Sequence, residues 1–137
     1  MSDFEHGLRV YWEDTDAGGV VFYANYLKFF ERARTEWLRA LGFEQERMRQ
    51  DDGLMFVVGS TALRYLSPAR LDDFLQVSVR LAECGRVSMT LHQTARCGER
   101  LLCEGEIRIG CVDSRTFKPT RIPASILQAL DAKPKQQ

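Results

Sequence analysis

The most regular pattern in the chain is a stripe of hydrophobic residues that recurs every three or four positions between residues 26 and 41. This spacing predicts a long α-helix with a hydrophobic side and a charged side. Asn25 is a plausible N-cap, and Gly42 suits the position just after the last turn. The hydrophobic stripe consists of Tyr26, Leu27, Phe29, Phe30, Ala33, Trp37, Leu38 and Leu41.

Residues 54–113 show a different pattern, in which hydrophobic and polar side chains alternate as they do in a strand with one buried face. Turn signals at Gly85 and Gly98 divide this region, and Gly59 marks an expected bulge. A further short strand is expected at 8–12, ahead of the helix. The four longer predicted strands are 54–66, 74–84, 86–96 and 101–113.

The order of strand, long helix and four-strand meander predicts a single α+β domain over residues 1–137. Because the helix stripe is wide, an antiparallel sheet of about five strands must curl around it. The alternation places Ser78 on the polar, solvent-facing side. We expect a core at about 7–130, a short helix opened by Pro123 and a disordered tail after about 132. Pairing with a second copy would cover the exposed sheet edge.

Composition excludes several classes of partner. Lys+Arg and Asp+Glu each number 19, so neither nucleic acid nor an anionic membrane surface is an expected partner. No hydrophobic run approaches the ~20 residues of a membrane-spanning helix, and the acidic N-terminus lacks a signal peptide, so we expect a cytoplasmic protein. The cysteines form no C-x-x-C pair and have no histidine at a metal-binding spacing, which predicts reduced thiols and no metal site. They are Cys84, Cys97, Cys103 and Cys111.

The stretch between the first predicted strand and the helix brings together two acids, two glycines and a helix start. A helix N-terminus presents unpaired N–H groups and a partial positive charge. A carboxylate aimed at the same point, from Asp14 or Asp16, would place a base beside an oxyanion site. The acids could instead cap local backbone N–H groups in an ordinary turn, and Gly18 and Gly19 could serve only that turn. The residues alone leave both interpretations open.

Taken together, these features resemble the 4-hydroxybenzoyl-CoA thioesterase-like family, whose members have the hotdog fold, an antiparallel sheet wrapped around one long helix. Residues 14–21 carry the pattern D-x-D-x-x-G-V-V, and Asn25-Tyr26 follow it. The helix sequence at 26–36 and the segment 65–69, with Asp72-Asp73 after it, support the same match. The resemblance covers about residues 7–130, and the Tol-Pal-associated acyl-CoA thioesterases are its closest branch.

The resemblance implies that Asp16 is the catalytic carboxylate. It also implies that a backbone N–H near Tyr23 polarises the thioester carbonyl, so Asp16 and Tyr23 are the predicted catalytic residues, with Asp14 structural. The Tol-Pal branch carries a histidine at the position of Tyr23, whereas the hydroxybenzoyl branch carries a tyrosine there. The predicted substrate-binding residues are Gly18, Gly19, Val20 and Asn25, with Lys118 and Arg121 for the phosphates of coenzyme A.

We therefore expect a thioester hydrolase that converts short-chain aliphatic acyl-CoA, and secondarily aromatic acyl-CoA, to a free acid and coenzyme A. Asp16 would act as nucleophile or general base. No cofactor is expected apart from the coenzyme A of the substrate. A homodimer or a dimer of dimers (a homotetramer) is expected, with the site near the subunit interface.

Two alternatives belong to other classes. A non-catalytic module would bind acyl carrier protein or an envelope-lipid enzyme through the same pocket and would release no thiol from acyl-CoA. A hotdog hydratase would add water to enoyl-CoA, again without thiol release. A related dehydratase would need a histidine facing the carboxylate, and the Asp16 loop contains none.

Overall fold

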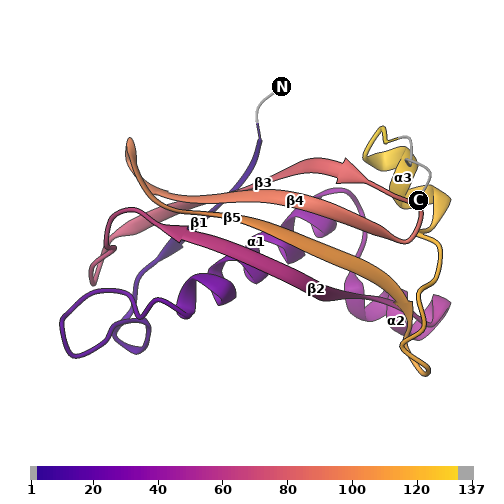
Figure 1. Cartoon of the computed structure of the whole chain (residues 1–137), viewed down its shortest axis with the longest axis horizontal. Helices are drawn as coiled ribbons and strands as arrows, with labels where there is room; N and C mark the ends of the chain where they lie inside the picture. The colour runs from indigo at the N-terminus through magenta and orange to yellow at the C-terminus, as the bar shows by residue number, and fades with distance from the viewer. Residues whose placement is uncertain (1–2, 133–137) are drawn as a thin grey trace.

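The computed structural model of the chain describes residues 3–132 and shows a five-stranded antiparallel sheet curled around one long helix (Figure 1). The strand order is β1-β3-β4-β5-β2. The strands are β1 (Phe4–Arg9), β2 (Leu54–Tyr65), β3 (Phe74–Cys84), β4 (Ser88–Cys97) and β5 (Arg100–Asp113). The helices are α1 (Asn25–Ala40), α2 (Gln45–Asp52) and α3 (Ala124–Ala129), with a short 3-10 turn η1 (Trp12–Asp14). The predicted α+β hotdog architecture is confirmed.

Helix α1 forms the centre of the core, as its hydrophobic stripe predicts. Phe29, Phe30 and Ala33 are 0% exposed, and fully burying one large hydrophobic side chain contributes about 1.5–3 kcal/mol. The prediction that Asn25 caps the helix is wrong by one residue, because Ala24 occupies the cap and Asn25 is the first helical residue. The helix ends as predicted, with Gly42 at a φ of 97° just after it.

The first strand lies earlier in the chain than predicted. β1 pairs with β3 from Phe4 opposite Val79 to Arg9 opposite Phe74. Val10 and Tyr11 lie beyond the strand, and Trp12 begins η1 instead of ending a strand. The strand β2 contains the expected irregularity at Gly59, where the register with β5 shifts between Val58 and Ser60.

Four polar side chains on β3 and β4 are buried, those of Ser78, Ser88, Gln93 and Thr94. The prediction that Ser78 faces solvent is therefore wrong. The Ser78 and Thr94 hydroxyls share a hydrogen bond of 2.7 Å. Gln93 is 0% exposed and lies between the sheet and α1. Its Nε2 donates to the carbonyls of Phe30 and Ser78 at 3.0 and 3.3 Å, and its Oε1 accepts from Nη1 of Arg34 at 3.0 Å. These groups satisfy one another, which allows their burial.

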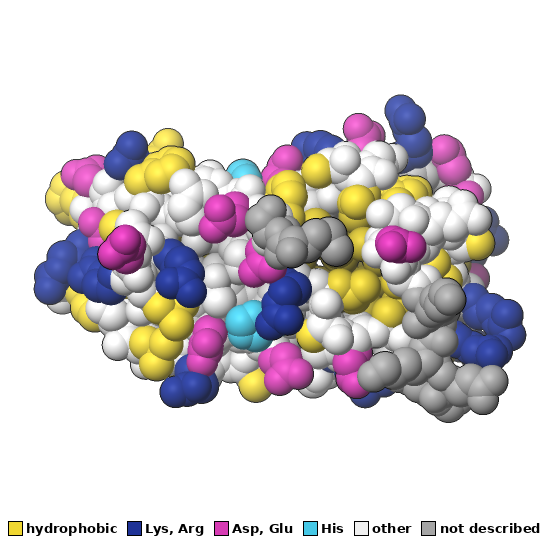
Figure 2. All heavy atoms as spheres, turned by 90° about the horizontal axis from the view of Figure 1, so that it is seen from above, with side chains coloured by type: hydrophobic (Ala, Val, Ile, Leu, Met, Phe, Trp, Pro, Cys, Tyr) yellow, Lys and Arg dark blue, Asp and Glu magenta, His cyan; other side chains and the backbone are white. Residues whose placement is uncertain are grey.

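The two ends of the molecule carry different features. The loop between β1 and α1 lies at the left-hand end of Figure 1, and α3 lies at the right-hand end, after Pro123 as predicted. Seen from above, acidic and basic side chains are interspersed, and hydrophobic side chains gather in the right-hand half, towards α3 (Figure 2). No helix within the described residues is long and apolar enough to cross a membrane. The predicted disordered tail after Ala132 lies outside those residues.

Candidate active site

Asp14 holds together the loop that follows β1. It is only 6% exposed, and its Oδ2 accepts the backbone N–H of Tyr11 at 2.8 Å. Its main-chain carbonyl accepts two more hydrogen bonds, from the N–H of Phe22 at 3.0 Å and from Nδ2 of Asn25 at 2.8 Å. Asp14 therefore ties the start of the loop to the start of α1. The side chain of Asn25 is buried in this anchor.

Asp16 lies at the exposed tip of the same loop. Its Oδ1 accepts the N–H of Gly18 at 2.8 Å. Its backbone N–H donates to Val20 at 2.9 Å, and its carbonyl accepts from Gly19 at 3.0 Å. Gly19 has a φ of 79°, a left-handed conformation that favours glycine. This tight turn fixes the carboxylate through Oδ1, and Oδ2 has no hydrogen-bond partner among the residues that the structure describes.

The chain enters α1 directly after this turn. The backbone N–H groups of Phe22 and Asn25 are both paired, with the carbonyls of Asp14 and Phe22. The N–H groups of Tyr23 and Ala24, which lie between them, have no acceptor within residues 3–132. An unpaired N–H at a helix start is suited to a developing negative charge. The turn and the helix start are joined further by a bridge between Thr15 and Val21.

A cavity of about 310 Å³ opens beside the start of α1. Two separate segments line it, one containing Val21, Tyr23 and Tyr26 and the other containing Tyr65 and Pro68. Sequence reasoning assigned no role to Tyr26 or Tyr65 in a pocket. The only sequence signal for Tyr65 was its place in the segment 65–69, which contributes to the family resemblance. Asp16 does not line the cavity, but the turn that carries it pairs with Val21 through the neighbouring Thr15.

Tyr26 is a buried residue of the cavity lining, and Ala69 lies beside it. Tyr26 is 3% exposed, and burial raises the pKa of its hydroxyl to about 12, although a hydrogen bond with the backbone of Ala69 acts in the opposite direction. The carbonyl of Ala69 accepts the N–H of Val21 at 2.8 Å. Ala69 therefore connects the segment that follows β2 both to α1 and to the stretch before it.

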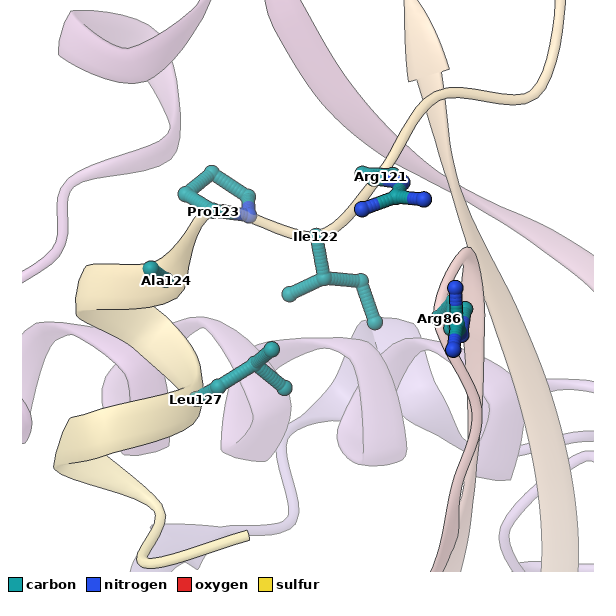
Figure 3. Close-up of a pocket in the computed structure, with 6 residues that line it drawn as sticks. All are labelled: Arg86, Arg121, Ile122, Pro123, Ala124 and Leu127. Carbon is teal, nitrogen blue, oxygen red and sulfur yellow. The ribbon is translucent and has the colours of Figure 1, made fainter. Parts of the chain in front are cut away.

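The two predicted phosphate-binding residues lie far from Asp16 in the single chain. Arg121 and Arg86 line a cavity of about 500 Å³ beside α3, at the opposite end of the molecule from the Asp16 loop (Figures 1 and 3). Figure 3 shows their guanidinium groups on one side, with Ile122 and Leu127 providing an apolar floor. Lys118 is exposed and does not line this cavity.

The cysteines contribute no reactive group to either cavity. All four are free thiols, as predicted, and only Cys97 is more than slightly exposed. Burial raises the pKa of Cys103 to about 12 and that of Cys111 to about 11, so both stay protonated at neutral pH. Among the described residues, no three side chains of the histidine, cysteine, aspartate and glutamate type come together as metal ligands.

Comparisons with known proteins agree with this architecture. Residues 10–130 match the thioesterase-like superfamily. The acyl-CoA thioesterase YbgC of Haemophilus influenzae is 40% identical over 126 residues, which cover 92% of this chain and 93% of that protein. The acyl-CoA thioester hydrolase YbgC of Escherichia coli is 42% identical over 125 residues, with coverage of 90% and 92%.

Solved structures give the same result. A probable thioesterase from Bartonella henselae superposes with a TM-score of 0.86 at 33% identity, and the match covers 89% of this chain and all (100%) of that one. Both the sequence and the fold therefore connect the chain to enzymes that hydrolyse thioesters. The chain belongs to the thioesterase-like superfamily, the family that its D-x-D-x-x-G-V-V segment predicts.

Proposed function

We propose that the protein hydrolyses short-chain aliphatic acyl-CoA to a free acid and coenzyme A, with Asp16 as the catalytic carboxylate. One observation supports this proposal above the others. The unpaired N–H of Tyr23 lies at the start of α1, and backbone hydrogen bonds connect this helix start to the turn that holds Asp16. A helix-terminal donor beside a carboxylate is the pair of groups that acyl transfer from a thioester requires.

The chemistry follows from these two groups. As a general base, Asp16 takes a proton from water while the water oxygen bonds to the thioester carbonyl carbon. The N–H of Tyr23 stabilises the oxyanion that forms, and the C–S bond then breaks to release the thiolate of coenzyme A, which takes up the proton. As a nucleophile, Asp16 would first form a mixed anhydride that water then hydrolyses. A thiol leaving group has a pKa near 8.5, so neither route needs a serine–histidine–aspartate triad.

Coenzyme A is held at its phosphate end by Arg121 together with Arg86, while Lys118 adds positive charge nearby. The cavity lined by Arg86 and Arg121 and the loop that carries Asp16 lie at opposite ends of the folded molecule. In each active site, one copy therefore supplies the carboxylate and a second copy supplies the arginines. The edge strand β2 suits this assembly, since it is 12 residues long and, among the described strands, pairs only with β5. Antiparallel pairing of two β2 strands around a two-fold axis brings opposite ends of the two copies together.

The homodimer or dimer of dimers, the cytoplasmic location and the association with the Tol-Pal system that the resemblance implies all stay predictions. Acyl carrier protein stays a predicted alternative carrier of the acyl group. Aromatic acyl-CoA is the second candidate substrate class. The tyrosine rings that line the cavity beside Tyr23 favour it, because aromatic rings pack well against one another.

Thiol release from a panel of aliphatic and aromatic acyl-CoA esters tests the proposal. Wild-type protein should hydrolyse short aliphatic esters fastest. Asp16→Asn keeps an acceptor for the Gly18 N–H, so it should fold normally while losing about 10²- to 10⁴-fold in kcat. Glu13→Gln, a change at an exposed acid in the same loop, should keep wild-type activity. A folded Asp16→Asn protein with the wild-type rate would disprove the assignment, and a wild type that releases no thiol would favour the binding-module or hydratase alternative.

A further inference from the structure

The three tyrosines of the cavity beside α1 stand in different positions. Tyr26 is buried, so its ring forms the floor of the cavity. Tyr23 belongs to the helix start. Tyr65 ends the strand β2 and is 49% exposed, so it stands at the rim of the cavity. No step of the proposed reaction involves Tyr65.

The ring of Tyr65 spans the wall between the other two tyrosines. It stands edge-on to Tyr23, with ring centroids 6.0 Å apart and planes at 85°. It is tilted by 55° against Tyr26 at 5.8 Å. Because Tyr65 is the last residue of a paired strand, opposite Cys103 of β5, its backbone is held in place. The paired backbone and these two ring contacts place the Tyr65 ring on one wall of the cavity.

The Tyr65 ring lines the cavity into which the acyl group of a thioester bound at Tyr23 would extend. Val21 lines the cavity, and its backbone pairs with Ala69 on one side and with Thr15, next to Asp16, on the other. An acyl carbonyl bound at the N–H of Tyr23 would thus direct its chain towards the cavity. The volume of about 310 Å³ is at the lower end of the range for small-molecule pockets, about 300–1,000 Å³.

We propose that Tyr65 is a specificity-determining residue whose ring limits the length of the acyl chain that the cavity accepts. This inference rests on the proposed thioester hydrolysis and names the side chain that selects among its substrates. The short chains preferred by the wild type fill the space up to the Tyr65 ring, and longer chains meet the ring.

The experiment compares kcat/KM for straight-chain acyl-CoA esters of 4 to 12 carbons in the wild type, Tyr65→Ala, Tyr65→Leu and two controls. Tyr65→Phe keeps the ring and removes only the hydroxyl. Arg64→Ala changes the preceding residue on β2, where an exposed ion pair with Glu104 contributes little to stability. Binding of S-butyl- and S-octyl-CoA thioethers, which cannot be hydrolysed, is measured in parallel as a readout independent of turnover.

In Tyr65→Ala and Tyr65→Leu the optimum should move to chains two to four carbons longer. Each methylene group that gains room in an apolar pocket improves binding about fourfold, so the preference for S-octyl- over S-butyl-CoA should rise at least tenfold. Tyr65→Phe and Arg64→Ala should keep the wild-type profile. An unchanged length profile in both enlarged variants, or an equal loss for all chains, would overturn the inference while leaving wild-type hydrolysis intact. If the wild type releases no thiol, the proposed function fails. The binding data then test this inference alone: if Tyr65→Ala and Tyr65→Leu keep the wild-type preference between S-butyl- and S-octyl-CoA, the inference is overturned as well.

Discussion

The backbone N–H of Gly18 donates to Oδ1 of Asp16 at 2.8 Å, and a Cβ added to Gly18 would lie 3.2 Å from that same oxygen. The glycine therefore does more than allow the chain to turn. Its lack of a side chain lets the Asp16 carboxylate rest against the backbone of the turn. The orientation of this carboxylate depends on a residue two positions further along the chain.

Gly18→Ala should reduce catalysis more than stability. The added methyl group pushes Oδ1 by a few tenths of an ångström, and misplacement of a reacting group by about 1 Å can lower the rate about 10²-fold. We therefore expect kcat to fall by about threefold to tenfold, with an almost unchanged denaturation midpoint. Gly19→Ala is the matched comparison. Nothing lies within 4 Å of a Cβ added to Gly19, but its φ of 79° strains any L-residue. It should lower the free energy of unfolding by about 1–2 kcal/mol. Equal kcat values for Gly18→Ala and wild type would contradict the role given to Gly18.

Removing the positive charge of Arg121 should affect only substrates that carry phosphates. Arg121→Ala, and more strongly the double change with Arg86→Ala, should raise KM for acyl-CoA and leave kcat nearly unchanged, because the guanidinium groups bind a remote part of the substrate. The matching acyl-pantetheine lacks the phosphates, so its KM should not change. Lys118→Ala tests the exposed charge outside the cavity and should have a smaller effect. Equal changes in KM for both substrate types would exclude the cavity beside α3 as the phosphate site.

Much of the fold was predictable because the strongest patterns belong to elements whose environment is simple. Helix α1 is buried along one stripe, so its period of 3.6 residues shows directly in the sequence. Strand β3 was predicted with its observed bounds, since turn residues flank it on both sides. The first strand was misplaced for a physical reason. The carboxylate of Asp14 accepts the N–H of Tyr11 and draws the chain into a 3-10 turn, a contact that no periodicity encodes.

The residues of the candidate site could be grouped from the sequence only where they are neighbours along the chain. Asp16, Gly18 and Tyr23 lie within one stretch, and the structure keeps them on one loop and helix start. Arg86 and Arg121 line the same cavity because the β3–β4 connection lies against the segment before α3. The backbone N–H of Ile122 donates to the carbonyl of Arg86 there, at 2.8 Å. Such a meeting is a property of the fold, so local patterns could not indicate it.

Gln93 shows the same limit in the core, and its burial leads to a stability prediction. Gln93→Met keeps the shape but leaves the Phe30 and Ser78 carbonyls without its amide donor and Arg34 without its acceptor. We expect a loss of about 1–3 kcal/mol in the free energy of unfolding, measured by urea denaturation. His92→Met on the same strand is the control and should cost less than about 0.5 kcal/mol, since His92 is only partly buried. A Gln93→Met protein as stable as the control would show that these hydrogen bonds add nothing net.

Tyr26 should make the fold sensitive to alkaline pH. Its folded-state pKa is about 12, whereas its unfolded value is about 10. Between these values the unfolded chain loses the proton and the folded chain keeps it, so the stability that is fully present below pH 10 is lost as pH rises towards 12. The shift corresponds to about 2–3 kcal/mol. Tyr26→Phe should lower stability by about 1 kcal/mol at pH 8, because the bond to Ala69 is lost.

The informative quantity is the difference between the wild-type and Tyr26→Phe stability curves from pH 8 to pH 12. Cys111 also has a raised pKa, but it titrates in both proteins and cancels in the difference. Cys103 has a raised pKa too, and because its charge helps to raise the pKa of Tyr26, their mutual repulsion belongs to the difference. Above pH 10 the wild type should lose stability more steeply than the variant, and the two curves should converge. Tyr11→Phe removes the hydroxyl of a tyrosine that is 62% exposed and serves as the matched control for the substitution itself. Parallel curves for the wild type and Tyr26→Phe would mean that the hydroxyl at the floor of the cavity ionises as freely as one in water, and that this part of the cavity is open to solvent.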